Sequence, residues 1–222
     1  MIQIEKTEVC GWEPAIRGMR NPHNSWDRAD SDWEFVEDPS IINPNDEVKF
    51  VLGENDADLM RRLCKGGPVH AKFRRMITVY VDITAPLYWW KEFDTYKVGT
   101  TANSCSTMHK IHAKEFTIDD FSHEHLTTHF MADLECTILS LNYARKRFLE
   151  TDDKVYWWQM IQLLPTSYNQ KRTVELNYEV LVGIYRDRKT HKLDEWHRLC
   201  EWIESLPYSW IITGEEKKDA KT

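Results

Sequence analysis

The alternation of apolar and polar residues is clearest near the middle of the chain. From Ile77 to Ile83 every second residue is apolar, which is the period of a strand with one buried face. Pro86 follows closely, and proline is tolerated in the first turn of a helix because its missing N–H costs nothing there. We therefore predict a strand that leads directly into a helix from Leu87 to about Lys97. The small polar residues at 100–107 favour a loop, and a strand, helix and polar loop together commonly support a ligand site.

The strand period of two residues and the helix period of about 3.6 residues predict the other elements. They predict an edge strand at 2–9, a short helix from Gly11 to about Met19, and helices at about 56–65, 132–150, 152–163, 173–188 and 191–206. Asn55 or Asp56, and Thr151, are side chains of the kind that cap the helices following them. Residues 20–48 are polar with scattered aromatic residues and predict a long surface loop, and residues 214–222 predict a charged, frayed end.

Composition and charge narrow the class of protein. The 222 residues fit a single domain over 1–222, or a domain with a small additional lobe, and a hydrophobic content of 41% is enough for a core. A formal net charge of -7 argues against binding to nucleic acid. No apolar run approaches the roughly 20 residues of a membrane span, and the first residues do not resemble a signal peptide. Five scattered cysteines, at positions 10, 64, 105, 136 and 200, indicate reduced thiols and a cytoplasmic protein.

Five histidines lie between 108 and 132, and three of them form the pattern His-Glu-His-x-x-x-His at 123–129. On a helix, His125 and His129 would share a face, as the two histidines of a zinc site do. Leu126 stands where the catalytic glutamate of that zinc motif would be, and no third ligand is evident. The alternative is a polar segment with solvated histidines, and we expect no metal.

The predicted helix at 173–188 carries a polar residue at each end of an apolar stripe. Asn177, Leu181, Ile184 and Arg188 are spaced at i, i+4, i+7 and i+11, so they share one face of a helix. Asn177 and Arg188 would then lie about 16 Å apart and could bracket a ligand. The alternative is an ordinary exposed arginine at a helix end.

The segment after the central strand resembles the flavin-dependent thymidylate synthases. That family has a strand ending in a small residue and proline, an Arg/Lys-Gln pair, and the motif Arg-His-Arg-x-x-Ser-x-Asn-Glu-x-Ser-x-Arg. Aligned without gaps from Ala85-Pro86, Lys91-Glu92 take the positions of the pair and Thr95-Tyr96-Lys97 those of Arg-His-Arg. Thr100 and Cys105 stand at the two serines, Ala102-Asn103 at Asn-Glu, and Thr107 at the last arginine.

A second block of resemblance continues in the same frame. The family has Leu-Pro after a helix, then an asparagine, then an arginine eleven residues after that asparagine. This chain has Leu164-Pro165, Asn177 and Arg188, and upstream it has His70 after a helix that ends in glycine. The resemblance covers roughly residues 53–206, with extra sequence in the 103–132 region. It implies an α+β fold, with a mixed sheet packed with helices.

The resemblance also implies a chemistry and a set of partners. In the family, FAD is held between the subunits of a homotetramer, NADPH reduces it, and methylenetetrahydrofolate supplies the carbon transferred to C5 of dUMP. Arg188 would be the catalytic residue, because it would bind the pyrimidine and stabilise negative charge on it. The residues that would contact the flavin are His70, Lys72, Tyr96, Lys97, Asn103 and Asn177. The residues that would lie near the nucleotide are Glu92, Thr100, Cys105 and Arg188.

Several positions depart from the family. A nucleotide phosphate favours paired arginines. The family's arginines are replaced here by Thr95, Thr107 and Ile161, and Glu179 is a further mismatch. Lys110, Lys171 and Arg172 are candidates to compensate. The sequence favours a divergent enzyme that acts on dUMP or a related pyrimidine nucleotide. The alternatives are a non-catalytic relative that binds a nucleotide or flavin, and an unrelated metal enzyme.

Cys105 stands at a serine near the pyrimidine in this frame. A thiolate is suited to attack C6 of a pyrimidine, and Lys97, Lys110 and nearby histidines could lower the pKa of this thiol. The alternative is a small residue that fills space.

Overall fold

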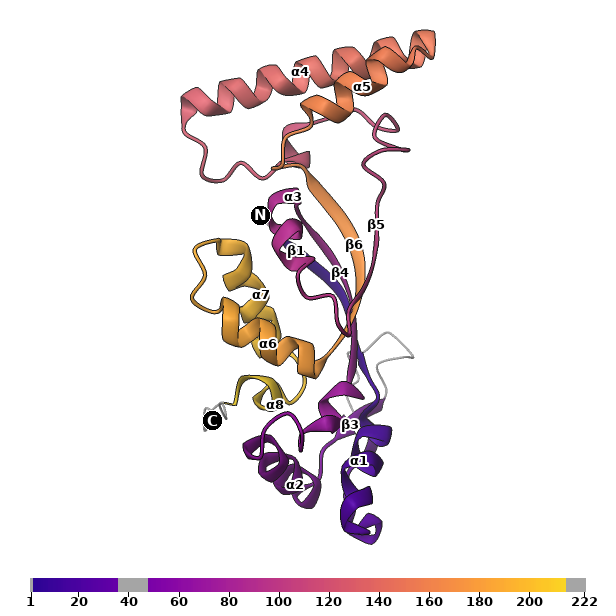
Figure 1. The fold of residues 1–222 in the computed structure, drawn as a ribbon, viewed down its shortest axis with the longest axis vertical. Coiled ribbons are helices and arrows are strands. Elements are labelled where there is room, and N and C mark those ends of the chain that lie inside the picture. The colour runs from indigo at the N-terminus through magenta and orange to yellow at the C-terminus, as the bar shows by residue number, and fades with distance from the viewer. Residues whose placement is uncertain (1, 36–47, 215–222) are drawn as a thin grey trace. The chain divides into compact units, whose positions relative to one another are not determined.

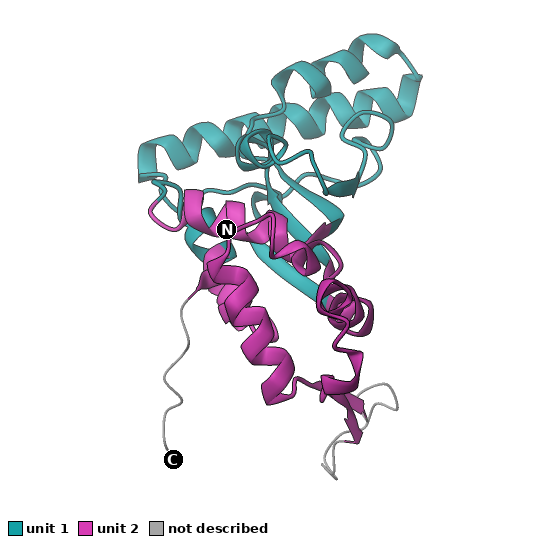
Figure 2. Cartoon of the chain, turned by 60° about the horizontal axis from the view of Figure 1, so that its bottom comes forward, with its two compact units in different colours: residues 1–7, 80–175, 191–199 teal, residues 8–79, 176–190, 200–222 magenta. Residues whose placement is uncertain are grey.

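The computed structural model describes residues 2–35 and 48–214, and the chain forms two compact units (Figure 1, Figure 2). Unit 1 comprises residues 1–7, 80–175 and 191–199. Unit 2 comprises residues 8–79, 176–190 and 200–222. Each unit is therefore assembled from separate stretches of the chain, and several strands continue from one unit into the other.

The main sheet has four strands in the order β1, β4, β6, β5, with bounds Gln3–Cys10, Thr78–Pro86, Asn169–Asn177 and Thr101–Ser104. β5 runs antiparallel to β6, and Thr101 lies opposite Glu175. A second, two-stranded sheet pairs β2 (Asp32–Phe35) with β3 (Val48–Val51) in antiparallel register. The predicted central strand and the predicted edge strand are confirmed as β4 and β1, and so is the α+β class.

Eight α-helices and four short 3₁₀ helices are found in the described residues. The α-helices are α1 (Trp12–Arg20), α2 (Glu54–Lys65), α3 (Leu87–Phe93), α4 (Thr128–Thr151), α5 (Lys154–Leu163), α6 (Tyr178–Arg188), α7 (Asp194–Ser205) and α8 (Trp210–Thr213). The 3₁₀ helices are η1 (Asn21–His23), η2 (Trp26–Arg28), η3 (Lys72–Arg75) and η4 (Ile118–Asp120). No helix of the described chain is both long and apolar enough to cross a membrane.

Two predicted elements are wrong. The first half of the helix predicted at 173–188 is strand β6, in which Val174 and Leu176 are buried while Thr173 and Glu175 are exposed. That alternation is the period of a strand, and the helical period begins only at Tyr178. The loop predicted at 100–107 contains strand β5, whose residues are all exposed. Without a buried face, such a strand shows no alternation of apolar and polar residues.

The predicted caps and the predicted long loop also need correction. α2 begins at Glu54, so Asp56 lies inside the helix, where its buried carboxylate accepts a hydrogen bond from Arg20 at 2.6 Å. α5 is capped by Asp153, which accepts from Val155 N at 2.9 Å, because Thr151 still belongs to α4. The segment 20–48 contains η1, η2 and β2 in its described part, and residues 36–47 lie outside the described chain, as do 215–222 of the predicted tail.

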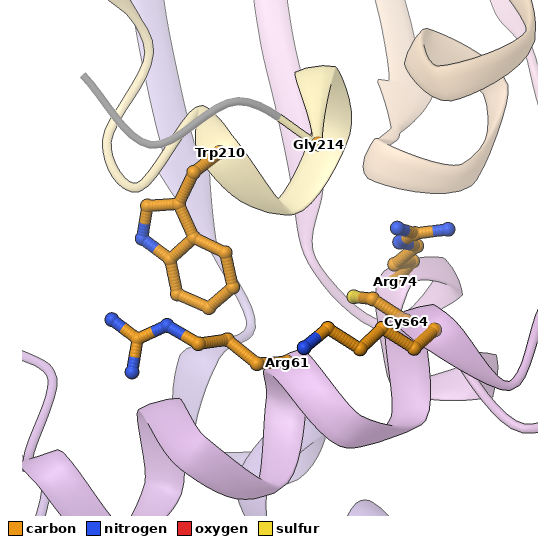
Figure 3. Close-up of a pocket in the computed structure, with 6 residues that line it drawn as sticks. Arg61, Cys64, Arg74, Trp210 and Gly214 are labelled. Atoms are coloured by element: carbon orange, nitrogen blue, oxygen red, sulfur yellow. The ribbon is translucent and has the colours of Figure 1, made fainter. Parts of the chain in front are cut away.

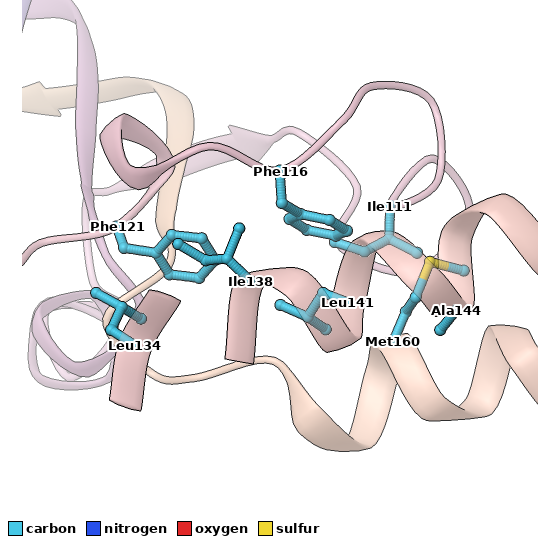
Figure 4. Packing of buried hydrophobic residues seen from close by; sticks show 8 residues of the cluster. All are labelled: Ile111, Phe116, Phe121, Leu134, Ile138, Leu141, Ala144 and Met160. Carbon is cyan, nitrogen blue, oxygen red and sulfur yellow. The ribbon is translucent and has the colours of Figure 1, made fainter. Parts of the chain in front are cut away.

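Unit 1 has an apolar core between α4, α5 and the segment before them (Figure 4). Its buried members are Ile111, Phe116, Phe121, Leu134, Ile138, Leu141, Ala144 and Met160. The predicted inward stripe of the helix at 132–150 is confirmed for Leu134, Ile138 and Leu141, and Phe148 packs against the same cluster while only partly buried. Through this core, α4 and α5 pack against each other and against the preceding segment of unit 1.

Unit 2 has an aromatic core that begins at α1. Trp12 stacks on Phe50 with ring centroids 5.3 Å apart, and its edge meets Tyr178 and Tyr208 at 5.6 and 5.4 Å. Offset and edge-to-face contacts of this kind are the favourable arrangements for aromatic rings. The first residue of α6 is therefore fixed within unit 2 by its ring.

Candidate functional site

Helix α3 is held in unit 1 by a cluster of aromatic side chains. Trp89, Trp90 and Phe93 are buried, and the Trp89 ring lies 4.8 Å from the ring of Trp90 and 4.8 Å from that of Trp196 in α7. Burial of several large aromatic surfaces stabilises the helix strongly, despite its short length. The residues that follow on α3 and after it are therefore presented from a rigid support.

The start of α3 is tied to other parts of unit 1. The hydroxyl of Tyr88 contacts the buried carboxylate of Glu195 and lies 3.3 Å from Ser122 Oγ. Burial, together with the hydrogen bond to Glu195, raises the pKa of Tyr88 to about 12. The phenol therefore stays protonated at neutral pH and serves as a donor to the carboxylate.

The carboxylate of Glu92 is engaged within unit 1. Trp196 Nε1 donates to Glu92 Oε2 at 3.1 Å, and Nε2 of His191 lies 3.3 Å from the same oxygen. The Glu92 side chain is 37% exposed, so one side of it remains open to solvent. Glu92, which the resemblance places near the nucleotide, thus also links α3 to α7. Sequence reasoning missed His191 and Trp196 as its partners, since both lie far away along the chain.

A pocket of about 350 Å³ lies just after α3 and brings three of the predicted residues together. Its lining consists of Phe93, Asp94, Tyr96, Lys97, Thr100 and Ala102. Tyr96 and Lys97 are predicted to contact the flavin, and Thr100 the nucleotide. Oγ1 of Thr100 is buried and has no hydrogen-bond partner. Such an unpaired buried hydroxyl costs about 1–3 kcal/mol, which a ligand bound in this pocket would recover.

Strand β5 carries Asn103 away from that pocket. Side chains of a strand alternate between its two faces, and Ala102 lines the pocket, so Asn103 points to the opposite face. Asn103 pairs in register with Thr173 of β6. Asn103 is therefore not part of the lining of this pocket, and its contact with the flavin stays a prediction.

Cys105 follows β5 and is held by its backbone. Its N–H donates to Lys171 O at 2.9 Å, and its carbonyl accepts from Gln170 Nε2 at 2.7 Å. The residue is exposed. The pKa of Lys114 is raised, first by its hydrogen bond with Asp120 and also by the neighbouring Cys105. Sequence reasoning missed Lys114 as a cation close to this thiol and named Lys97 and Lys110 instead.

Two of the candidates to replace the lost arginines are already in ion pairs. Nζ of Lys171 lies 3.2 Å from carboxylate oxygens of both Glu5 and Asp82. Arg172 donates to Asp94 at 2.7 Å, and its guanidinium lies 4.2 Å from the centroid of the Trp90 ring. Both cations therefore form contacts with the sheet and with the α3 segment, and neither is free of such contacts to bind a phosphate.

In unit 2, Asn177 and Arg188 lie at the two ends of α6. Asn177 is the N-cap residue, and its side chain accepts from Val180 N at 3.1 Å. Arg188 is the last residue of the helix and is partly buried. The pKa of Asp187 is lowered, first by Arg186 and also by Arg188. Asn177 therefore precedes the helix and serves as its cap, whereas Arg188 ends it.

The segment that carries Lys72 packs beside the start of α6. Arg74, which follows Lys72 in η3, lies with its Nη1 3.7 Å from Glu179 Oε2 in the first turn of α6. Lys72 itself is exposed. His70 is also exposed, in the turn after α2, where its N–H donates to Gly67 O at 3.0 Å. The structure therefore places Lys72 in a segment that packs against the helix that Asn177 caps.

The histidines of the 108–132 segment do not converge. His125 Nε2 lies 3.0 Å from Asp194 Oδ2, and His123 Nδ1 lies 2.8 Å from Phe121 O. The His112 ring packs against Phe148 at 5.0 Å. Over residues 2–35 and 48–214, no group of three or more His, Cys, Asp or Glu side chains is arranged to hold a metal ion.

Comparison with known proteins gives a match in structure alone. No family model and no curated protein matches the sequence. Thymidylate synthase X (ThyX) from Helicobacter pylori with FAD and dUMP matches with a TM-score of 0.66 and 14% identity, over 97% of this chain and 98% of that chain. A second structure of flavin-dependent ThyX from Helicobacter pylori, complexed with FAD and dUMP, matches with a TM-score of 0.64 and 13% identity, over 97% and 100% of the two chains.

A third match comes from an enzyme described as a methylase. PolB, a UMP/dUMP methylase from Streptomyces cacaoi bound with 5-Br dUMP, has a TM-score of 0.59 and 12% identity, over 92% of this chain and 88% of that chain. The chain therefore has the fold of these proteins over nearly all of its length, which supports the structural relationship predicted from the two sequence blocks.

Proposed function

We propose that this chain is a divergent flavin-dependent enzyme that transfers a one-carbon unit from methylenetetrahydrofolate to C5 of dUMP or a related pyrimidine nucleotide. The observation that carries the proposal is the pocket after α3, in which Tyr96, Lys97 and the unpaired Thr100 hydroxyl meet. The fold adds support, because solved proteins with this fold are described with FAD and dUMP. FAD would be the cofactor, NADPH its reductant, and the cytoplasm its compartment.

The chain offers suitable groups for FAD in both units. Bound FAD would supply the reducing equivalents of the reaction. Lys97 offers a cation and Tyr96 an aromatic ring at the pocket after α3. In unit 2, Asn177 uses its side-chain oxygen for the helix cap, so its amide N–H groups are left to donate. His70 and Lys72 are exposed before β4 and complete the proposed flavin contacts.

The nucleotide would be bound by Arg188, Thr100, Glu92 and Cys105. The Arg188 guanidinium would stabilise negative charge that develops on the pyrimidine ring during the reaction. Fewer side chains remain to bind the phosphate. Thr95, which stands at an arginine position of the family, donates its hydroxyl to Glu92 O at 2.7 Å, and Arg172 is paired with Asp94. We therefore include a pyrimidine nucleotide other than dUMP within the proposal.

A homotetramer is part of the same proposal. Besides its buried stripe, α4 has exposed apolar side chains, with Leu139 70%, Tyr143 62% and Phe130 57% exposed. α5 adds Val155 and Trp158, which are 58% and 45% exposed. Such large exposed apolar side chains are typical of subunit interfaces. Sedimentation of the protein at micromolar concentration should show a tetramer, and a monomer would contradict this part of the proposal.

Two measurements on the purified protein test the activity. The protein should show a flavin absorption spectrum, and it should release tritium from dUMP labelled at C5 only when methylenetetrahydrofolate is present. Arg188→Ala should abolish release with little change in melting temperature, while the matched control Arg186→Ala, at an exposed position of the same helix, should retain it. Flavin and dUMP binding without tritium release would instead favour the non-catalytic alternative.

Thr100→Val tests the pocket itself. The change removes the hydroxyl and keeps the shape of the side chain, so we expect nucleotide affinity to fall by about tenfold. Thr101→Val, at the exposed neighbouring position, is the matched control and should leave affinity unchanged. Equal behaviour of the two variants would mean that the Thr100 hydroxyl does not meet the ligand.

A further inference from the structure

A second pocket lies entirely within unit 2, and the resemblance assigns none of its residues a role. Its volume is about 410 Å³, and it is lined by Arg61, Cys64, Lys65, Arg74, Trp210 and Gly214 (Figure 3). These residues come from α2, η3 and the α8 segment. Among the described residues that line the pocket, three side chains carry a positive charge at neutral pH and none is acidic, so these residues favour an anion.

Arg74 is the buried cation of this pocket. The residue is only 7% exposed, and its Nη1 lies 3.7 Å from Glu179 Oε2, which is beyond hydrogen-bond distance. Both Nε of Arg74 and Oε2 of Glu179 are buried without a hydrogen-bond partner. A guanidinium with an unsatisfied buried N–H is unfavourable, because it has lost water and gained no acceptor in exchange. An acceptor group on a ligand in the pocket would satisfy it.

The opposite side of the pocket is formed by Arg61 and Trp210. The Arg61 guanidinium lies 5.0 Å from the centroid of the Trp210 ring, which is a cation–π contact. Figure 3 shows these two side chains on one side of the pocket and Arg74 with Cys64 on the other. Lys65 is one helical turn after Arg61 and is exposed. The pocket therefore has a buried cation at one wall and two further cations along α2.

The chemistry of the pocket points to a phosphate group. Guanidinium forks match phosphate oxygens and bind them with charge-assisted hydrogen bonds. Glu179 lies beside Arg74, and the described lining contributes three cations, Arg61, Lys65 and Arg74.

We propose that this pocket binds a small phosphate-bearing ligand, whose phosphate accepts hydrogen bonds from Arg74 and is flanked by Arg61 and Lys65. The binding site does not depend on the proposed function, since it shares no residue with the pocket after α3. Its occupant is a compact phosphate ester or a diphosphate, because the volume exceeds that of a bare phosphate ion while leaving little room for a large nucleotide such as FAD.

Calorimetric titration of the full-length protein with pyrophosphate and with inorganic phosphate tests the site. We expect saturable binding with pyrophosphate tighter than phosphate, and Lys65→Ala should weaken it by about fivefold. Arg62→Ala is the matched control, because Arg62 is also exposed on α2 but pairs with Asp58 at 3.1 Å and does not line the pocket. Absence of binding, or equal weakening by both variants, would overturn the proposal.

The role of Arg74 is tested by a paired substitution and by protection of Cys64. Arg74→Gln together with Glu179→Gln avoids leaving one buried charge unpaired, and it should abolish pyrophosphate binding while the thermal unfolding transition remains cooperative. In the wild-type protein, pyrophosphate should slow iodoacetamide labelling of Cys64 but not of the exposed Cys136. Unchanged affinity in the paired variant, or unprotected Cys64 under saturating pyrophosphate, would place the anion elsewhere.

Discussion

Two strands of the main sheet lead straight into a helix, and the two junctions are built differently. At the end of β4, Pro86 occupies the N-cap position of α3 and makes no side-chain hydrogen bond to the helix. At the end of β6, Asn177 occupies the same position before α6 and accepts from Val180 N. The first helix start depends on packing and the second on a side-chain cap, although both N-cap residues have an extended backbone.

Each junction also places a tyrosine at the start of its helix, half-buried in the case of Tyr88 and fully buried in the case of Tyr178. Tyr88 contacts the carboxylate of Glu195, while Tyr178 donates its hydroxyl to Pro207 O at 2.6 Å. Burial raises the pKa of Tyr88 to about 12 and raises that of Tyr178 further. At both junctions, contacts with distant segments stabilise the helix that follows the strand. A cap residue such as Asn177 has to combine capping with any contact to a ligand.

Removing the packing at the first junction should have the largest effect. Trp89→Ala should lower the free energy of unfolding by about 3–5 kcal/mol, because Trp89 is fully buried among Trp90, Phe93 and Trp196. Urea denaturation measures the change. The control Trp26→Ala, at a position that is 53% exposed, should cost far less. A similar cost for both variants would mean that α3 is not held by its aromatic cluster.

Alkaline pH should loosen the same junction by a smaller amount. The pKa of Tyr88 is raised from 10.0 in the unfolded chain to about 12, so the folded state keeps a proton that the unfolded state releases. Its contribution is fully present below pH 10 and is lost as pH rises toward 12. Two pH units correspond to about 2.7 kcal/mol, and partial exposure reduces this to about 1–2 kcal/mol.

Unfolding in urea across this pH window measures that contribution. Tyr88→Phe should flatten the decline of stability with pH, whereas Tyr143→Phe, at a residue that is 62% exposed, should leave it unchanged. Tyr178 continues to contribute in both variants, because burial raises its pKa as well. An equally steep decline in Tyr88→Phe would mean that ionisation of Tyr88 does not cause the loss of stability at alkaline pH.

At the second junction, Asn177→Ala should cost about 1 kcal/mol of stability, since it removes the N-cap of α6. Asn177→Asp keeps an oxygen that caps the helix and should be nearly neutral in thermal unfolding. The two variants separate the cap from the proposed flavin contact, because aspartate retains the cap but lacks the amide donor. Normal flavin binding by Asn177→Asp would leave Asn177 with the structural role alone.

Local sequence patterns were sufficient where one face of an element is buried. The alternation from Ile77 to Ile83 and the proline after it predicted β4 and the start of α3, and the apolar stripe of α4 predicted its buried face. The two blocks of resemblance also predicted a fold that the solved structures share at 12–14% identity. These features depend on backbone preferences and burial periods that extend over a few neighbouring residues.

Only the tertiary structure decided the edge strand β5, the strand half of the segment 173–188, and the partners of the charged side chains. β5 is exposed along its length, so nothing in its composition marks it, and its hydrogen bonds come from β6. Glu92 meets Trp196, and Arg74 meets Glu179, across about a hundred residues of chain each. Such pairs, and the pockets beside them, arise when distant segments pack together, and a local period carries no information about them.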